Sequence, residues 1–111
     1  AQLRFAGQQA MADHLPMTGA LSVSVEARFP VAKSWTKKKQ SAALCGEVRP
    51  TTTPDADNLL KSLDGLNGIV WGDDRQIVDA SVRKIYSERP GLTITVAPAG
   101  VVEIQHEGRI A

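Results

Sequence analysis

The chain has a single cysteine, Cys45, among 111 residues, so no disulfide can form within one chain. We interpret this cysteine as a small core residue, with a reactive thiol as the alternative. The chain also lacks any apolar run of about 18 residues, which excludes a membrane-spanning helix. Its first residues, AQLRFAGQQAMADH, contain no apolar stretch of the signal-peptide kind. These absences are compatible with a reducing cytoplasm.

Several common catalytic and metal-binding motifs are absent as well. There is no P-loop, no GxGxxG run and no Ser-His-Asp spacing. A zinc site is not expected, because His14 and His106 are far apart and Cys45 stands alone. We expect both histidines at the surface. An EF-hand calcium loop is excluded, because Leu59 and Leu60 occupy its fifth and sixth positions.

Charge is distributed unevenly, although the net charge is only +1. Residues 33–49 contain five basic residues against one acidic residue. Four of these basic residues are lysines, namely Lys33, Lys37, Lys38 and Lys39. Residues 54–78 instead contain five aspartates against Lys61 and Arg75. An acidic cluster next to a basic tract calls for a functional explanation, because like charges repel one another.

Composition and periodicity indicate a single globular domain over residues 1–111. Alternation of apolar and polar residues over 20–29 predicts a half-buried strand. Three helices are predicted, over residues 3–14, from an N-cap at Ser34 to Gly46, and from Asp57 to Gly68. Two more strands are predicted over residues 76–86, where Val78, Ala80 and Val82 share a face, and over residues 92–98. The tail over residues 100–111 has no clear pattern. This order predicts an α+β (mixed α/β) fold, a small mixed sheet with helices packed on one face.

Four aspartates and one lysine form the group of residues in which we expect chemistry. Asp55 and Asp57 stand at the start of the leucine-rich helix, and residues i and i+2 of an extended chain point to the same side. Lys61 lies one helical turn beyond Asp57 and reaches that side. Asp73 and Asp74 occupy the turn after the helix. If the helix packs on the sheet, this turn can return to the start of the helix.

Plainer interpretations exist for these residues. Asp57 can cap the helix, and Lys61 can form an exposed ion pair with it, worth roughly a few tenths of a kcal/mol. Converging carboxylates, however, suit Mg²⁺, which accepts one or two of them and keeps water and phosphate as its other ligands. Such an ion polarises a phosphoryl oxygen and lowers the pKa of the attacking water, while a lysine stabilises the developing charge. The pattern alone therefore predicts a metal-binding α/β domain with phosphotransfer as its candidate chemistry.

The whole stretch over residues 54–78, PDADNLLKSLDGLNGIVWGDDRQIV, resembles the signature of the RusA family of Holliday junction resolvases, which occur in phages and prophages. That signature consists of a D-x-D-N-L-x-K run, a helix with Asp-Ala/Gly-Leu, and a W-x-D-D-x-Q turn followed by an apolar residue. These elements begin here at Asp55, Asp64 and Trp71. The strand VDASVRKIY extends the similarity.

The resemblance implies a role for each residue of the site. Asp55, Asp57 and Asp74 would bind Mg²⁺, which Mn²⁺ can replace, and Lys61 would assist catalysis, while the role of Asp73 stays open. The implied enzyme is an endodeoxyribonuclease that resolves four-way DNA junctions by paired symmetric nicks in recombination and repair. It would act as a homodimer in the cytoplasm of a bacterial host. A two-fold dimer presents one site to each of two opposed strands.

The basic tract is expected to bind the substrate. SWTKKKQ resembles a basic segment of phage members of the family, and we expect four lysines to contact DNA, namely Lys33, Lys37, Lys38 and Lys39. The alternative is that they form a solvated helix face. Trp35 and Trp71 are expected to be packing anchors rather than platforms for base stacking.

One feature of the family is missing. Its members usually begin with a strand carrying a P-x-S-x-N-type segment, and nothing of this kind precedes Ala1. We therefore expect that the chain extends upstream. Two alternative functions stay open, a nuclease for other branched DNA and a non-catalytic DNA-binding protein with a decayed site.

Overall fold

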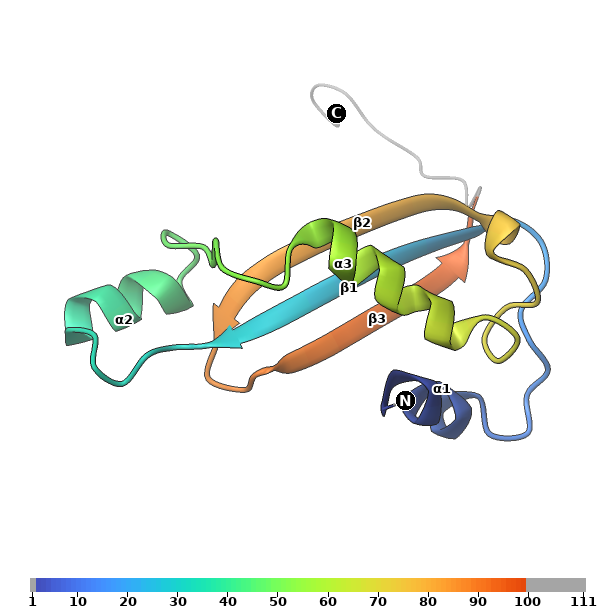
Figure 1. The fold of residues 1–111 in the computed structure, drawn as a ribbon, viewed down its shortest axis with the longest axis horizontal. Coiled ribbons are helices and arrows are strands. Elements are labelled where there is room, and N and C mark those ends of the chain that lie inside the picture. The colour runs from blue at the N-terminus through green and yellow to red at the C-terminus, as the bar shows by residue number, and fades with distance from the viewer. Residues whose placement is uncertain (1, 100–111) are drawn as a thin grey trace, which may run out of the picture.

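The computed structural model describes residues 2–99, in which the elements follow the predicted order (Figure 1). They are α1 Gln2–Met11, β1 Leu21–Pro30, α2 Lys37–Leu44, α3 Ala56–Lys61, β2 Ile77–Ser87 and β3 Gly91–Pro98. Two 3₁₀ helices, η1 Ser62–Leu66 and η2 Asp74–Gln76, lie between α3 and β2. The expected α+β class is confirmed. The tail over residues 100–111, with His106, lies outside the described residues.

β1 is the central strand of a three-stranded mixed sheet with the order β2-β1-β3. It runs parallel to β2 and antiparallel to β3. The predicted alternation is confirmed, because four buried residues of β1 alternate with half-buried or exposed ones. The buried residues are Leu21, Val23, Val25 and Ala27. On β3, Ile94 and Val96 lie opposite Val25 and Val23 and extend the same apolar face.

β2 departs from its predicted face at its beginning. Its register with β1 shifts between Leu21 and Ser22, which leaves Val78 as an extra residue without a partner on β1. A bulge of this kind interrupts the alternation of side chains. Val78 is consequently 58% exposed, whereas Val82 packs against the core. The residues predicted to share this face therefore differ in burial, and Val78 falls outside the regular pairing.

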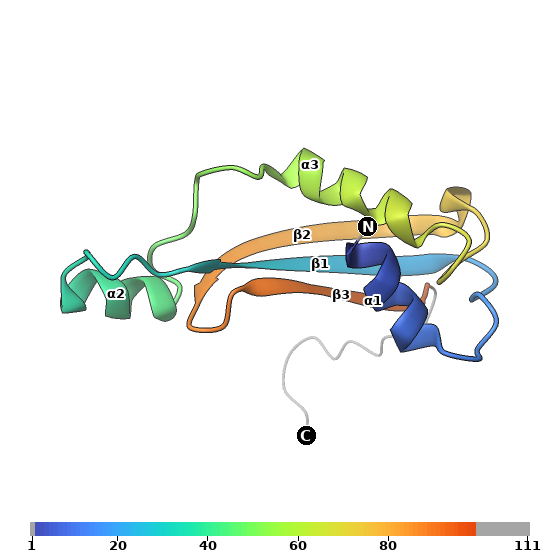
Figure 2. The same cartoon turned by 60° about the horizontal axis from the view of Figure 1, so that its bottom comes forward.

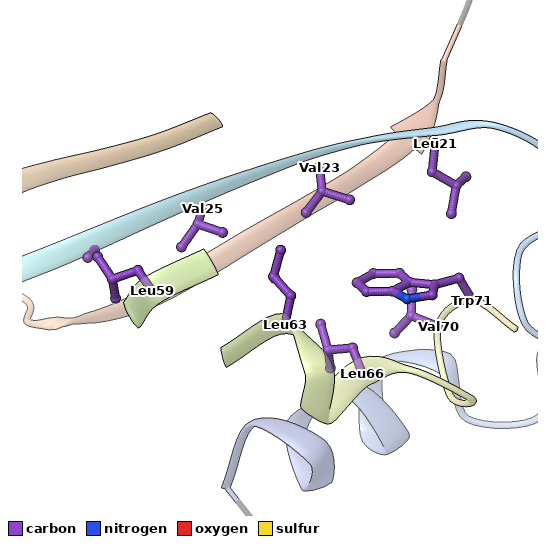
Figure 3. Packing of buried hydrophobic residues seen from close by; sticks show 9 residues of the cluster. Leu21, Val23, Val25, Leu59, Leu63, Leu66, Val70 and Trp71 are labelled. Atoms are coloured by element: carbon purple, nitrogen blue, oxygen red, sulfur yellow. The ribbon is translucent and has the colours of Figure 1, made fainter. Parts of the chain in front are cut away.

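α1 and the segment formed by α3 and η1 both contribute to the core on one face of the sheet (Figure 2). Leu59, Leu63 and Leu66 of this segment point towards β1, and Trp71 fills the end of the core beside Leu21 (Figure 3). Trp71 is fully buried, which confirms its predicted role as a packing anchor. None of the helices within residues 2–99 is long and apolar enough to cross a membrane.

α2 begins two residues later than predicted. Its N-cap is Thr36 and not Ser34, because Oγ1 of Thr36 accepts a hydrogen bond from the backbone N–H of Lys39 at 3.2 Å. Serine and threonine cap helices by the same chemistry, so the sequence pattern did not distinguish the two positions. Gly46, with φ +88°, supplies the predicted left-handed residue after the helix. Cys45 is exposed, so the expectation that it belongs to the core is wrong.

Candidate metal centre and nucleic-acid interface

The start of α3 carries the first pair of predicted carboxylates. Asp55 is the N-cap of this helix, and its Oδ1 accepts a hydrogen bond from the backbone N–H of Asn58 at 2.8 Å. Asp57, for which helix capping was the plainer interpretation, lies instead in the first turn. Both residues are exposed at the positive end of the helix, which favours their negative charge. Within residues 2–99, each of these carboxylates has one oxygen in a hydrogen bond or an ion pair, and its other oxygen can bind a cation.

Lys61 lies beside this pair, as predicted. Its Nζ is 3.1 Å from Oδ2 of Asp57, and the two side chains are 70% and 75% exposed. Solvent screens such a pair, so it contributes only about 0.3–0.5 kcal/mol to stability. Because breaking the pair costs so little, Lys61 can exchange the carboxylate for a phosphate oxygen.

Asp74 lies in η2, immediately before β2. Its Oδ1 accepts a hydrogen bond from Nε1 of the buried Trp71 at 2.8 Å. Trp71 therefore has a second role that the sequence did not predict, because its indole N–H orients this carboxylate. Since Nε1 is a donor only and lies in a buried ring, it needs an acceptor, and Asp74 provides one.

Gln76 holds the turn before β2 in place. Its Oε1 accepts hydrogen bonds from the backbone N–H groups of Gly72 and Asp73, both at 2.9 Å. Its Nε2 donates to the backbone carbonyls of Met17 at 2.9 Å and Gly19 at 3.0 Å. Asp73 and Gln76 form a capping box around η2. The spacing Asp-x-x-Gln is the sequence signal from which this role could have been predicted.

Gln76→Glu tests whether these hydrogen bonds stabilise the turn. We expect the substitution to lower the free energy of unfolding by about 2–3 kcal/mol at neutral pH, because a carboxylate oxygen would then face the carbonyls of Met17 and Gly19. Urea unfolding followed by tryptophan fluorescence measures this change. The control is Gln9→Glu on the exposed surface of α1, which should shift the free energy by less than about 0.5 kcal/mol. Equal stability of the two variants would contradict the prediction.

Asp73 is engaged by Arg75 within the same turn. Nη2 of Arg75 lies 2.9 Å from Oδ2 of Asp73, and the backbone N–H of Arg75 donates to Oδ1 at 2.8 Å. The hydrogen bonds from the Arg75 side chain and backbone lower the pKa of Asp73. The same contact raises the pKa of Arg75. Both carboxylate oxygens of Asp73 are therefore engaged by Arg75 within the same turn.

The contact between Asp73 and Arg75 predicts a pH dependence of known sign. A carboxyl whose pKa is lowered in the folded state adds stability above its unfolded pKa and loses this contribution as the pH falls through the folded value, below about pH 4. We expect carboxyl ¹³C NMR to report a pKa of Asp73 below the ordinary value. Arg75→Gln should raise it back towards that value, and an unchanged titration in this variant would contradict the assignment.

The two acidic groups, Asp55 with Asp57 and Asp73 with Asp74, lie at opposite ends of the segment formed by α3 and η1. Leu59 of α3 packs near Val25, whereas Trp71 lies beside Leu21, at the other end of the same face (Figure 3). Val25 lies four positions after Leu21 in β1, which corresponds to about 13 Å along the strand. Within residues 2–99, no three His, Cys, Asp or Glu side chains are grouped so that they could hold a metal ion.

One chain therefore brings together only part of the predicted site. Asp55, Asp57 and Lys61 lie at the start of α3, but Asp74 does not join them, since the turn after the helix does not return to its start. The pair that remains still fits Mg²⁺, which is commonly held by one or two carboxylates and completed by water and phosphate.

The predicted basic residues lie in and just before the first turn of α2, which projects beyond the end of the sheet (Figures 1 and 2). All of them are exposed, namely Lys33, Lys37, Lys38 and Lys39. Nζ of Lys39 lies 4.2 Å from the centroid of the Trp35 ring, which also meets the Tyr86 ring edge-on at 5.2 Å. Trp35 thus supports the base of α2 by packing. Three lysines at the positive end of a helix oppose its dipole, so this placement does not serve stability.

Comparisons with known proteins agree with the sequence motif. A model of the family described as "Endodeoxyribonuclease RusA" matches residues 1–97. The chain is 42% identical over 83 residues to the "Uncharacterized protein YqaN" of Bacillus subtilis (strain 168), an alignment that covers 72% of this chain and 58% of YqaN. The chain therefore spans less than two thirds of that relative. No solved structure matches this chain. Because the family match includes both acidic groups and nearly all of the described fold, the chain belongs to the RusA endodeoxyribonuclease family.

Proposed function

We propose that this protein is a Mg²⁺-dependent endodeoxyribonuclease that nicks branched DNA, with four-way junctions as its substrate. The observation that carries this proposal is the exposed carboxylate pair Asp55 and Asp57 with Lys61 beside it, in a chain of the RusA family. The family supports the nuclease activity. The metal, the junction and a role in recombination and repair belong to the proposal.

Each residue of the site has a distinct task in this proposal. Asp55 and Asp57 would hold Mg²⁺. Asp74 does not reach them within one chain, so it would act as a further ligand only from the second copy of the expected homodimer. When bound, the ion would polarise a phosphoryl oxygen and lower the pKa of a water molecule. Lys61, now 3.1 Å from Asp57, would donate to a phosphate oxygen and stabilise the charge that develops as the phosphodiester is attacked.

The N-terminus of α2 is the proposed contact for the DNA backbone. The lysines there would release counterions from the phosphates they contact, which is the main source of affinity for DNA. The first backbone N–H groups of a helix also attract phosphate, and α2 is capped by a neutral threonine rather than by an acid. A basic element that projects from the body of the protein can follow a DNA arm leaving a junction.

A second function has one observation in its favour. Asp74 does not reach Asp55 and Asp57 within a single chain, as expected of a DNA-binding protein whose nuclease site has decayed. Such a protein would bind junctions and leave them intact in Mg²⁺ and in Mn²⁺.

A nicking assay on a synthetic four-way junction tests the proposal. We expect symmetric nicks in Mg²⁺, none in EDTA, and no cutting of a linear duplex with the sequence of one arm. Binding is measured in parallel by gel shift. Junction binding without cleavage in either metal would support the decayed site instead. Equal cleavage of the junction and the duplex would contradict the proposed substrate.

A further inference from the structure

The segment that joins α2 to α3, residues 45–55, is fastened to β2 close to the carboxylate pair. It contains no helix or strand, and it passes over the last part of β2 (Figure 1). Nη1 of Arg49 donates to the backbone carbonyl of Lys84 at 3.2 Å. Nζ of Lys84 in turn donates to the backbone carbonyl of Thr52 at 2.6 Å. These two hydrogen bonds form a clasp, made of Arg49, Thr52 and Lys84, that fixes the path of the chain just before α3.

The side chain of Lys84 is itself held in place. It lies on the face of the sheet that carries α3, because Val82, two residues earlier in β2, packs against the core and alternate residues of a strand share a face. The side chain is half-buried, and Nζ lies 5.2 Å from the centroid of the Phe29 ring. An aromatic ring attracts a cation at this distance. The ring and the Thr52 carbonyl therefore restrain the ammonium group together.

The clasp determines where Asp55 stands. Only two residues, Thr53 and Pro54, separate Asp55 from the clasp. Both have restricted backbones, because the proline ring locks its own φ and also limits the residue before it. Asp55 is the N-cap and has an extended backbone, whereas Asp57 lies within the helix. The position of Asp55 relative to Asp57 therefore depends on the chain that the clasp holds.

We propose that Lys84 is a positioning residue for the nuclease. Through the Thr52 carbonyl it holds Asp55 at the distance from Asp57 at which both carboxylates bind one Mg²⁺. This inference rests on the proposed function, and in it Lys84 contacts neither the metal nor the DNA. Loss of a group that orients a metal ligand typically costs about 10- to 100-fold in metal affinity or activity. A displacement of about 1 Å can cost about 10²-fold in rate.

Lys84→Met tests the proposal, because methionine keeps an unbranched apolar side chain beside Phe29 but cannot donate to Thr52. We expect the affinity for Mn²⁺, measured by electron paramagnetic resonance, to fall about 10-fold. The single-turnover rate of nicking a four-way junction should fall about 10²-fold. Junction binding in EDTA, measured by gel shift, should not change. Lys84→Arg restores a donor for the carbonyl and should recover most of the affinity and the rate.

Two further variants provide the controls. Arg83 is exposed and lies on the opposite face of β2 from Lys84, so Arg83→Met makes the same change of charge without touching the clasp. It should bind Mn²⁺ and nick at the normal rate. Arg49→Met removes the other hydrogen bond of the clasp and should weaken Mn²⁺ binding by a smaller factor. Because Arg49 is exposed, this variant should fold even if Lys84→Met does not.

A double variant separates positioning from direct contact. If Lys84 acts through Asp55, Lys84→Met should cause no further loss of Mn²⁺ affinity in a protein that already carries Asp55→Asn. A lysine that binds phosphate itself would instead weaken junction binding in EDTA, and this result would overturn the positioning role.

Three other outcomes are decisive. If Lys84→Met is less stable in urea but binds Mn²⁺ normally when folded, the clasp is only structural and the inference is wrong. Equal losses in Lys84→Met and Arg83→Met would overturn it as well. The nuclease function survives both results. If Asp55→Asn binds Mn²⁺ and nicks as the unsubstituted protein does, or if the unsubstituted protein does neither, both the proposed function and this inference are wrong.

Discussion

Asp55→Asn should abolish nicking of a four-way junction while binding of the junction is retained or improved. Removing one carboxylate from a Mg²⁺ site weakens the binding of the metal ion and, with it, the charge stabilisation that the ion supplies. We therefore expect the cleavage rate to fall on the order of 10³-fold, equivalent to about 4 kcal/mol. Binding should not fall, because a negative charge near the phosphates is removed. The helix should also persist, since asparagine caps a helix nearly as well as aspartate does.

Asp64→Asn is the matched control for this substitution. Asp64 is exposed in η1 on the same helical segment, and its replacement makes the same change of charge away from the site. It should nick at the normal rate. Asp55→Ala should lose cleavage and also about 1 kcal/mol of stability, because the cap on the Asn58 backbone N–H is removed. Equal nicking rates for Asp55→Asn and Asp64→Asn would exclude Asp55 as a metal ligand.

Replacing Lys37, Lys38 and Lys39 together by glutamine should weaken junction binding by about 10²-fold at moderate salt. We assume roughly 1 kcal/mol for each phosphate contact that is lost. The slope of log K against log salt should become less steep by up to about 2.7, because as many as three fewer counterions are released. Stability should change by less than about 1 kcal/mol, because the lost contact between Lys39 and the Trp35 ring is offset by the removal of charges that oppose the dipole of α2. Fluorescence anisotropy with a labelled junction over a salt series measures the affinity and the slope.

The corresponding triple arginine variant separates charge from folding. It keeps the three positive charges at the start of α2 and should bind with nearly normal affinity and salt dependence. If the glutamine variant binds as tightly as the arginine variant, with the same slope, α2 does not contact DNA and the solvated-face interpretation holds.

Local sequence patterns were sufficient for most of the fold. The alternation in β1 and the leucine spacing from Leu59 to Leu66 each depend on which side chains share a face of one element, and both were predicted correctly. Capping was predicted less well, since Ser34 and Thr36 can both cap a helix and the structure has Thr36 as the cap. The bulge at Val78 was not predicted, because a bulge depends on the pairing with the neighbouring strand, and the sequence of one strand does not contain that information.

For the site, the sequence alone determined the residue types and their local contacts. Asp55, Asp57 and Lys61 are close together because they share less than two turns of helix, so their spacing along the chain was sufficient. Only the tertiary structure decided that Asp74, which accepts a hydrogen bond from Trp71, lies at the far end of the core. The physical reason is that the distance between two elements depends on how both pack on β1, and no local repeat in the sequence encodes that distance.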